Sequence, residues 1–348
     1  MINVKKFWFL FSLGIVLGLV SCNYLSVQEA STPTINGDEI MTQIAQTVDA
    51  EMQKEQPEMI TNTPEPEAEE EAPVATPSLE VQPVQYSGAV PYSHIDFDGD
   101  GITDIAVLRI SNGKWYVKDQ EVSSWYQEGD IPVPGDYDGD GITDKAVFRP
   151  STGTWYIKDK SDMNTKWGQA GDVPMPGDYD GDGDTDFAIF RPSNANWYII
   201  GQEPIKWGNT EDIPVPCDYD GDGDTDIAVY RLENGNWYVK DQSPVSWGQA
   251  DDILVPGDYD GNGTCDFAVY RPSNSTWYIK DQEPVKWGYP GDIPVPGDYN
   301  GDGATDIAVL RTAEGKWYIM DQFVVTWYQD GDYPLSVRDT NADGDPYQ

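Results

Sequence analysis

A nine-residue segment rich in aspartate and glycine recurs along this 348-residue chain at a nearly constant interval. Its first copy has the sequence DFDGDGITD. The six copies begin at Asp96, Asp136, Asp178, Asp218, Asp258 and Asp298, at spacings of 40, 42, 40, 40 and 40 residues. A unit repeated at this interval folds as one supersecondary element that buries its apolar face against its neighbours.

The residues between the segments repeat as well. Each segment runs into an alternating stretch such as 105–109, then a turn and a Trp-Tyr stretch such as 155–157. A stretch ending in a second Trp follows, such as 284–287, and then a Pro-containing stretch such as 292–297. Alternation with period two between turn residues is typical of short strands. Four strands per 40 residues predict an all-β fold, a β-propeller of about six four-stranded blades over residues 86–348, with seven blades as the alternative. A parallel β-helix fits less well because its coils are usually shorter.

The Pro-containing strand occurs seven times, whereas the other three strands occur six times. Its first copy is 89–92 and its last is 333–335. Propellers often close by combining strands from both termini in one blade. We therefore expect six blades, with the last short strand closing the ring and the two ends of the repeat region close together.

The repeated loop places oxygen ligands around one point. Positions 1, 3, 5 and 9 carry carboxylates, position 6 is a glycine that permits a sharp turn, and position 7 offers its backbone carbonyl. Calcium takes six to eight such oxygens.

The sequence therefore predicts about six structural Ca²⁺ ions, and sites five and six are expected to be weaker because they contain Asn262 and Asn300. The predicted ligands are Asp96, Asp98, Asp100, Ile102 and Asp104; Asp136, Asp138, Asp140, Ile142 and Asp144; Asp178, Asp180, Asp182, Asp184 and Asp186; Asp218, Asp220, Asp222, Asp224 and Asp226; Asp258, Asp260, Asn262, Thr264 and Asp266; and Asp298, Asn300, Asp302, Ala304 and Asp306. The alternative is an Asp/Gly-rich turn that binds no ion. A further copy that begins at Asp339 has Tyr347 at position 9 and is expected to be degenerate.

On these loops and strands, the chain resembles the FG-GAP/VCBS repeat family, the calcium-binding propeller blades of integrin α-subunits and many bacterial surface proteins. The resemblance covers about residues 88–345. It implies calcium-binding blades and a role in binding or adhesion at a cell surface. The Phe-Gly and Gly-Ala-Pro elements of the integrin version are absent, and segments such as Arg149-Pro150 stand in their place.

Two further residue types repeat with the blades. Two tryptophans per repeat are expected to pack between adjacent blades, although exposed rings could also stack on sugars. These tryptophans are Trp115, Trp125, Trp155, Trp167, Trp197, Trp207, Trp237, Trp247, Trp277, Trp287, Trp317 and Trp327. An arginine lies 13 residues after each loop's first aspartate, and we expect it to pair with repeat aspartates such as Asp130 and Asp172. The sequence leaves open whether Cys217 and Cys265 pair.

Composition restricts the function. The net charge is −40, from 61 acidic and 21 basic residues, so no basic face is available for nucleic acid. The single histidine, His94, excludes most histidine-dependent catalysis and histidine-rich zinc sites. We therefore predict a non-enzymatic binding or adhesion protein whose partner is a surface protein or a glycan. The alternatives are a lectin-like propeller, a glycan-active enzyme, which would require a unique carboxylate pair, and a structural spacer.

The N-terminus resembles a bacterial lipoprotein signal. Lys5 and Lys6 precede a 14-residue apolar run, residues 7–20, which is too short to span a membrane comfortably and is followed by Ser21 and Cys22. We predict a signal peptide over residues 1–21, lipidation of Cys22, and export to the cell envelope with the propeller outside the cytoplasm. Residues 22–85, rich in Pro and Glu, are expected to form a disordered acidic tether with one possible short helix at 38–55.

Lipidation can be tested through Cys22. We expect labelled palmitate to be incorporated into the wild-type protein in its host but not into Cys22→Ser, which should appear in the medium because a stable anchor requires acyl chains. A Cys22→Ser protein that stayed in the membrane fraction would indicate an uncleaved N-terminal anchor instead.

Overall fold

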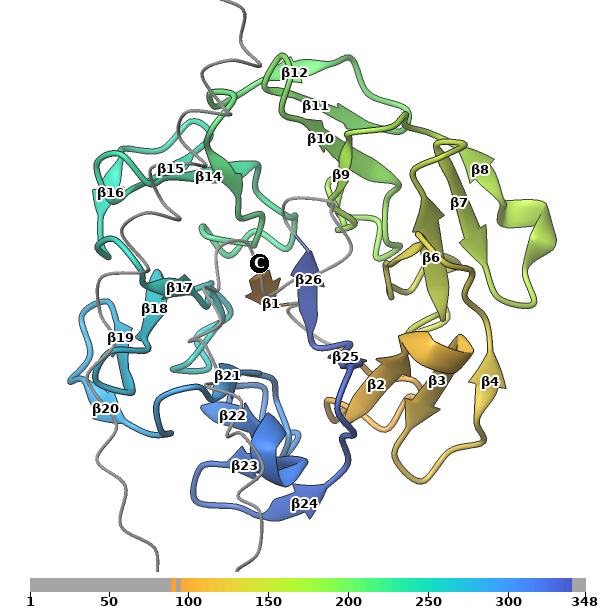
Figure 1. Cartoon of the computed structure of the whole chain (residues 1–348). Coiled ribbons are helices and arrows are strands. Elements are labelled where there is room, and N and C mark those ends of the chain that lie inside the picture. The colour runs from red at the N-terminus through yellow and green to blue at the C-terminus, as the bar shows by residue number, and fades with distance from the viewer. Residues whose placement is uncertain (1–88, 92–94, 340–348) are drawn as a thin grey trace, which may run out of the picture. The chain divides into compact units, whose positions relative to one another are not determined.

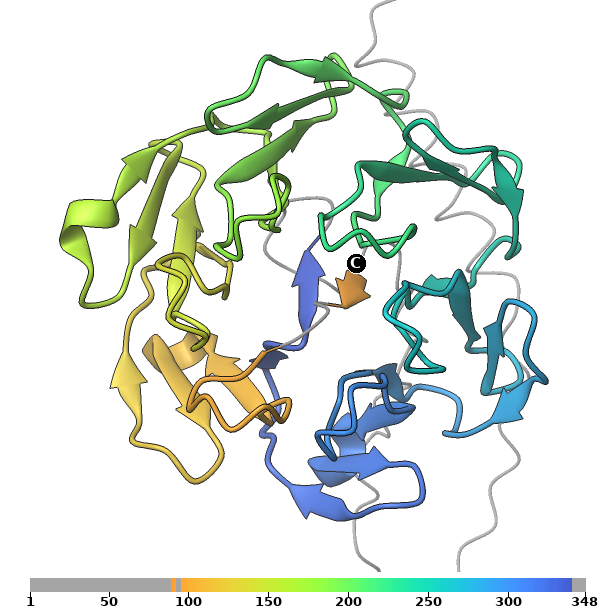
Figure 2. The same cartoon turned by 180° about the vertical axis from the view of Figure 1, so that it is seen from behind.

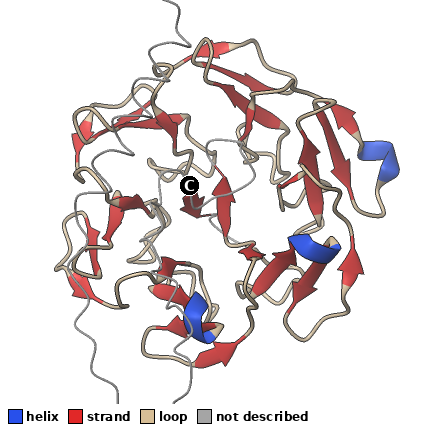
Figure 3. Cartoon of the chain, in the orientation of Figure 1, coloured by secondary structure: helices blue, strands red, loops and turns tan. Residues whose placement is uncertain are grey.

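The computed structural model describes residues 89–91 and 95–339, which form a six-bladed β-propeller (Figure 1). Each blade is a four-stranded antiparallel sheet, so the prediction of six blades is confirmed and the seven-bladed alternative is wrong. Within this described part, the helical segments are three single turns of 3₁₀ helix, η1 (Ile110–Asn112), η2 (Ser161–Met163) and η3 (Thr312–Glu314) (Figure 3). The signal peptide, the tether with its helix at 38–55, and Cys22 lie outside the described residues, as does most of the degenerate seventh loop.

The strands follow the same order in each blade, from the innermost to the outermost. Blade 1 contains β25 (Asp332–Pro334), β2 (Ala106–Arg109), β3 (Lys114–Val117) and β4 (Ser123–Ser124). Blade 2 contains β5 (Ile131–Pro132), β6 (Ala146–Arg149), β7 (Thr154–Ile157) and β8 (Thr165–Lys166). Blade 3 contains β9 (Val173–Pro174), β10 (Ala188–Arg191), β11 (Asn196–Ile199) and β12 (Ile205–Lys206). Blade 4 contains β13 (Ile213–Pro214), β14 (Ala228–Arg231), β15 (Asn236–Val239) and β16 (Val245–Ser246). Blade 5 contains β17 (Ile253–Leu254), β18 (Ala268–Arg271), β19 (Thr276–Ile279) and β20 (Val285–Lys286). Blade 6 contains β21 (Ile293–Pro294), β22 (Ala308–Arg311), β23 (Lys316–Ile319) and β24 (Val324–Thr326).

The pattern of apolar and polar residues in each strand follows from how that strand is buried. The second strand of every blade has three consecutive buried residues before its arginine, because both of its faces are covered. The third strand alternates, for example in β7, where Trp155 and Ile157 are buried and Thr154 and Tyr156 are partly exposed. The outermost strand has no fully buried residue, consistent with its short length and its few apolar residues.

The ring closes through strands from both ends of the repeat region. β25 pairs with β2, where Leu108 lies opposite Tyr333, so the C-terminal strand completes blade 1. β26 (Val337–Asp339) then pairs antiparallel with β1 (Ala89–Pro91) inside the ring of blades (Figures 1 and 2). This arrangement confirms that the last Pro-containing strand closes the ring.

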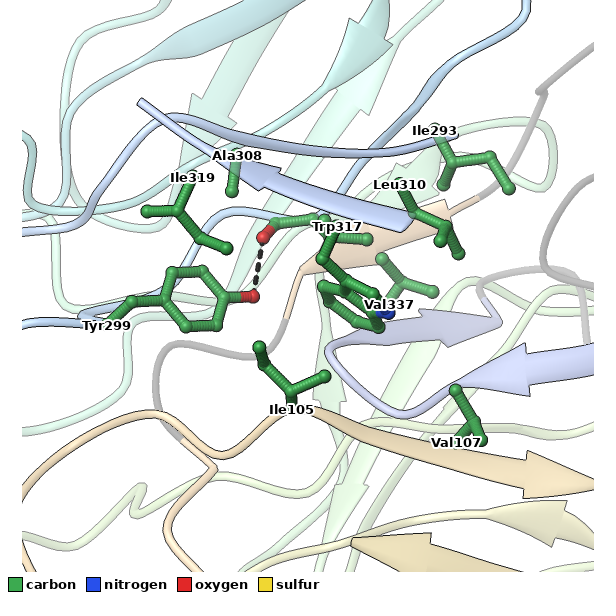
Figure 4. Packing of buried hydrophobic residues seen from close by; sticks show 10 residues of the cluster. Ile105, Val107, Ile293, Tyr299, Ala308, Leu310, Trp317, Ile319 and Val337 are labelled. Atoms are coloured by element: carbon green, nitrogen blue, oxygen red, sulfur yellow. Dashed lines mark hydrogen bonds between the residues drawn. The ribbon is translucent and has the colours of Figure 1, made fainter. Parts of the chain in front are cut away.

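The core lies between adjacent blades. In the cluster drawn in Figure 4, Ile105 and Val107 of blade 1 pack against Trp317 and Ile319 of blade 6, and Tyr299 donates a hydrogen bond to a nearby carbonyl. The first tryptophan of each blade is fully buried in such a cluster. The second tryptophan is partly buried, and its Nε1 donates to the backbone carbonyl of the Trp-Tyr tyrosine in the next blade, at 2.9–3.4 Å. The donors are Trp125, Trp167, Trp207, Trp247, Trp287 and Trp327. The tryptophans therefore pack between blades, as predicted.

Each repeat arginine forms a bidentate ion pair with a buried aspartate at the start of the innermost strand. Arg149 donates from Nε and Nη2 to the two carboxylate oxygens of Asp130, at 2.7 and 2.8 Å. Arg109 pairs in the same way with Asp332, 223 residues away in sequence, so the closing strand is held like the others. This confirms the predicted arginine–aspartate pairing.

Cys217 and Cys265 form a disulfide, with their Cα atoms 6.1 Å apart, that joins blade 4 to blade 5. At four other junctions the corresponding places hold a glycine and a threonine, and between blades 1 and 2 they hold Ile95 and Thr143. A Cβ on Gly135, for example, would lie 2.8 Å from Cγ2 of Thr185. The disulfide therefore replaces a close van der Waals contact between blades with a covalent link.

Removing the closing strand tests this architecture. Deletion of residues 332–348 removes the buried Tyr333, Leu335 and Val337, each worth about 1.5–3 kcal/mol of burial, and exposes the edge of β2. We expect a loss comparable to the whole stability of a domain, seen as a lost or sharply lowered melting transition and as aggregation.

Deletion of residues 340–348 alone is the matched control, because it keeps β25 and β26. Equal melting temperatures for the two truncated proteins would contradict closure by β25.

Candidate metal centres

The six aspartate-rich loops occupy equivalent places in the six blades, each leading into the second strand. We number them by blade: loop 1 (96–104), loop 2 (136–144), loop 3 (178–186), loop 4 (218–226), loop 5 (258–266) and loop 6 (298–306). The backbone N–H at position 8 of each loop donates to the carbonyl at position 1 of the preceding loop, at 2.5–2.7 Å. Thr143 donates to Asp96 and Thr103 donates to Asp298, so the chain of bonds closes on itself. The loops therefore form a continuous ring.

The first aspartate organises the loop backbone. In loop 1, Oδ1 of Asp96 accepts N–H groups from Asp98, Gly99 and Asp100, and Oδ2 accepts one from Gly101. Burial opposes ionisation of Asp96, but these four hydrogen bonds outweigh it and lower the pKa of this carboxyl. Asp96 is thus held ionised by the fold of its loop.

The carboxylates at positions 1, 3 and 9 converge. In loops 1 to 5 they offer one oxygen each, and these oxygens lie within 4.8 Å of one another, a spacing that could hold one metal ion. The groups are Asp96, Asp98 and Asp104; Asp136, Asp138 and Asp144; Asp178, Asp180 and Asp186; Asp218, Asp220 and Asp226; and Asp258, Asp260 and Asp266. In loop 6 the corresponding residues are Asp298, Asn300 and Asp306, and the amide of Asn300 donates to Oδ1 of Asp306 at 3.2 Å.

The side chains at positions 5 and 7 take other roles. The position-5 side chain accepts the backbone N–H of position 7 in every loop, at 2.8–3.0 Å; these residues are Asp100, Asp140, Asp182, Asp222, Asn262 and Asp302. The position-7 side chain lies against the position-4 glycine of the preceding loop. A Cβ on Gly99 would lie 3.0 Å from Cγ1 of Ile142, and Gly99 also has a φ of +75°. In two loops this neighbour is a carboxylate, because Asp184 lies at Gly139 and Asp224 lies at Gly181.

Burial and the neighbouring carboxylates raise the pKa values of several loop aspartates. Burial is the main cause of raising the pKa of Asp104 and of Asp186 to about 6; a backbone hydrogen bond opposes the shift, and the other loop aspartates add to it. Burial also raises the pKa of Asp144, but there Lys160 opposes the shift. The metal-free loops therefore concentrate negative charge that a cation would stabilise.

A cavity of about 410 Å³ lies where blade 6 meets blade 1. Its lining includes Asp98, Asp100 and Asp104 of loop 1, and Phe323 and Val324 at the start of β24. Phe323 and Val324 are 43% and 54% exposed. We call this cavity the seam pocket.

The apolar side of the seam pocket departs from the repeat. The places of Phe323 and Val324 are taken by Glu-Pro or Ser-Pro in blades 3, 4 and 5 and by Glu121-Val122 in blade 1, so Phe323 is the residue that departs from these blades. The seam pocket is therefore a local break in the symmetry of the propeller.

Several of these features were missed by the sequence analysis. They are Asp184 and Asp224 as neighbours of the preceding loop, Phe323 in the pocket, and Lys160 at loop 2. Aligning the repeats would have exposed Phe323 and Lys160, because each breaks the consensus of its column. No sequence pattern indicates that the side chain of Asp184 contacts the preceding loop. Within residues 89–91 and 95–339, no helix is long and apolar enough to cross a bilayer.

The sequence matches no model of a protein family and no curated protein. Among solved structures, the chain is similar to an Agrocybe aegerita lectin that recognises non-reducing terminal N-acetylglucosamine. The TM-score is 0.44 and the identity 16%, covering 75% of this chain and 83% of the lectin. It is also similar to a catalytically inactive virginiamycin B lyase from Staphylococcus aureus with quinupristin. There the TM-score is 0.40 and the identity 9%, covering 59% of this chain and 72% of the lyase.

The raised pKa values predict that the metal-free protein becomes less stable as pH rises through the weakly acidic range. Between the ordinary pKa of 3.8 and about 6, folded Asp104 and Asp186 bind more protons than they do in the unfolded chain. The free energy of unfolding should therefore fall as pH rises through this window, and thermal melts after metal removal should give a higher melting temperature at about pH 5 than at about pH 7.5.

Saturating calcium is the control. It should raise the melting temperature at about pH 7.5 and remove the advantage of the lower pH, because the ions compensate the ionised carboxylates. A metal-free protein that is more stable at the higher pH would contradict this account of the loops.

Proposed function

We propose that this chain is a calcium-stabilised, non-enzymatic binding propeller, exported and held at the cell surface through lipid on Cys22. The observation that carries the proposal is the repetition of one oxygen-rich carboxylate group in blade after blade. Carboxylate and carbonyl oxygens without histidine or cysteine ligands suit calcium, whose coordination is flexible. Membership of the FG-GAP/VCBS repeat family is part of the same proposal.

A structural role for calcium follows from where the loops lie. Each loop is bonded to the next, so an ion that compacts one loop also stabilises a junction between blades. At calcium ten times above its dissociation constant, each occupied site adds about 1.4 kcal/mol to the free energy of unfolding. Six sites could together contribute about 8 kcal/mol, which is comparable with the net stability of a domain.

The distribution of carboxylates supports a binding function over an enzymatic one. A glycan-cleaving site needs a pair of carboxylates that serve as acid and as base or nucleophile. The acids that line the seam pocket belong to the repeat: Asp98, Asp100 and Asp104 are loop residues, and Asp119 has counterparts in other blades such as Asp281. These acids are accounted for by loop structure.

We place the ligand site in the seam pocket and propose a glycan as the ligand. The exposed ring of Phe323 offers an apolar face, and loop 1 offers carboxylate oxygens and its proposed cation to the same pocket. A saccharide presents an apolar ring face and several hydroxyl groups, which matches this pairing of an apolar wall with a few oriented polar groups.

Glycan binding can be tested on arrays that carry glycans and matrix proteins side by side. We expect the purified calcium-loaded propeller to bind glycans, and Phe323→Ala to reduce that binding at least about tenfold because the stacking face is lost. Leu232→Ala is the matched control, since Leu232 is a 50% exposed apolar residue of blade 4 outside the seam pocket.

Binding to matrix proteins alone would favour the adhesion alternative, and equal binding by Phe323→Ala would remove the seam pocket from the proposal. Turnover of a glycan, lost on substitution of one acid, would overturn the non-enzymatic assignment.

A further inference from the structure

Loop 2 differs from the other loops in the group that lies against its carboxylates. The ammonium Nζ of Lys160 lies 2.5 Å from Oδ2 of Asp138 and 2.6 Å from Oδ1 of Asp144. Asp138 and Asp144 are two of the three carboxylates of the loop 2 metal group. The side chain of Asp144 is 10% exposed, whereas those of Asp138 and Lys160 are 33% and 25% exposed. A cation of the chain itself is thus placed among the loop 2 ligands.

The other five blades carry a neutral glutamine at the place of Lys160: Gln120, Gln202, Gln242, Gln282 and Gln322. Gln120, Gln242 and Gln282 donate from Nε2 to Oδ2 of the position-9 aspartate, at 3.1–3.5 Å. That same Oδ2 already accepts the backbone N–H of position 2, as Asp104 does from Phe97. Oδ1 is therefore the oxygen better able to ligate an ion, and in loop 2 this is the oxygen of Asp144 that Lys160 contacts.

The turn that carries Lys160 also departs from the repeat. Two extra residues lengthen this part of blade 2, which accounts for the single spacing of 42, and η2 follows Lys160 directly. Met163 N–H donates to the carbonyl of Lys160, and Asn164 Oδ1 accepts the N–H of Ile157. The lysine is thus held at the base of an ordered turn.

The local charge of loop 2 is high. Besides its own aspartates, the carboxylate of Asp184 from blade 3 lies against Gly139 of loop 2. Charges at this spacing repel one another unless a cation lies between them, and an ammonium hydrogen-bonded to two carboxylates supplies one permanently.

We infer that Lys160 is the built-in cation of loop 2 and takes the place that a metal ion takes in the other loops. The inference rests on the proposed binding of calcium by those loops. It lowers the expected number of bound ions by one from the six that the sequence predicts. Blade 2 then keeps its loop ordered at calcium concentrations that empty the remaining sites.

Counting ions by native mass spectrometry and equilibrium dialysis tests the inference on the whole propeller. Lys160→Gln gives loop 2 the residue of the other blades and should bind one more calcium ion than the wild type. Gln242→Lys transfers the lysine to blade 4 and should bind one ion fewer. Lys158→Gln is the matched control, because Lys158 pairs with the exposed Asp159 outside the metal group and its loss should leave the count unchanged.

Melting in chelator gives a second readout that needs no bound calcium. Lys160→Gln should melt at a lower temperature than the wild type there, because Asp138 and Asp144 lose the ammonium between them, and saturating calcium should remove this difference. Lys158→Gln should melt like the wild type in both conditions.

Equal ion counts for the wild type and Lys160→Gln would overturn the inference, because the ammonium would then give way to the metal. If no variant binds calcium, the proposed calcium sites fail, and replacement of a metal by Lys160 fails with them. Lower melting of Lys160→Gln in chelator would then show that the ion pairs themselves are real. Unchanged melting in chelator would show that Lys160 does not stabilise loop 2 and would overturn the inference independently.

Discussion

Every blade of this protein depends on its neighbour to bury its apolar face. A four-stranded sheet of this length has too small a face to form a core alone, and the core clusters accordingly combine residues of adjacent blades. The second tryptophan of each blade adds a hydrogen bond across the junction, from Trp125 to Tyr156 and finally from Trp327 back to Tyr116. The stability of the propeller therefore comes from contacts between adjacent blades, and a closed ring gives every blade a neighbour on both sides.

The aspartate-rich loops belong to this lateral system. Their backbones are bonded from one blade to the next, and each position-7 side chain covers the preceding loop. Two places in this ring carry an additional link: the Cys217–Cys265 disulfide between blades 4 and 5, and the Lys160 ammonium in loop 2. The disulfide limits the freedom of two loops to separate, and the ammonium offsets the repulsion between clustered carboxylates.

Near-perfect repetition also restricts where a ligand can bind specifically. A feature present in all six blades is best explained by architecture, as the buried tryptophans and the arginine–aspartate pairs show. Function is then expected where the repetition fails. The junction of the first and last blades is such a place, because Phe323 stands beside loop 1 where blades 1, 3, 4 and 5 have a glutamate or a serine.

The sequence alone predicted the fold class, six blades in preference to seven, and a convergence of carboxylates at positions 1, 3, 5 and 9. The structure brings together those at positions 1, 3 and 9, while the position-5 side chain accepts a backbone N–H of its own loop. Period, alternation and turn residues are local properties, and six copies of one pattern allow a single arrangement to satisfy them all. The pairing of Arg149 with Asp130 could also be predicted from the sequence, because an arginine and an aspartate recur 19 residues apart in the neighbouring blades.

Only the tertiary structure decided the contacts that cross from one blade to another. Asp184 reaches the preceding loop and Cys217 meets Cys265 because blade rotation brings residues 45–48 positions apart into contact, a distance that no local pattern encodes. The same holds for Lys160, whose ammonium reaches Asp138 and Asp144 through the course of a turn. A long side chain can point in several directions from one backbone position, and the packing around it selects the one that places its charge among the loop 2 carboxylates.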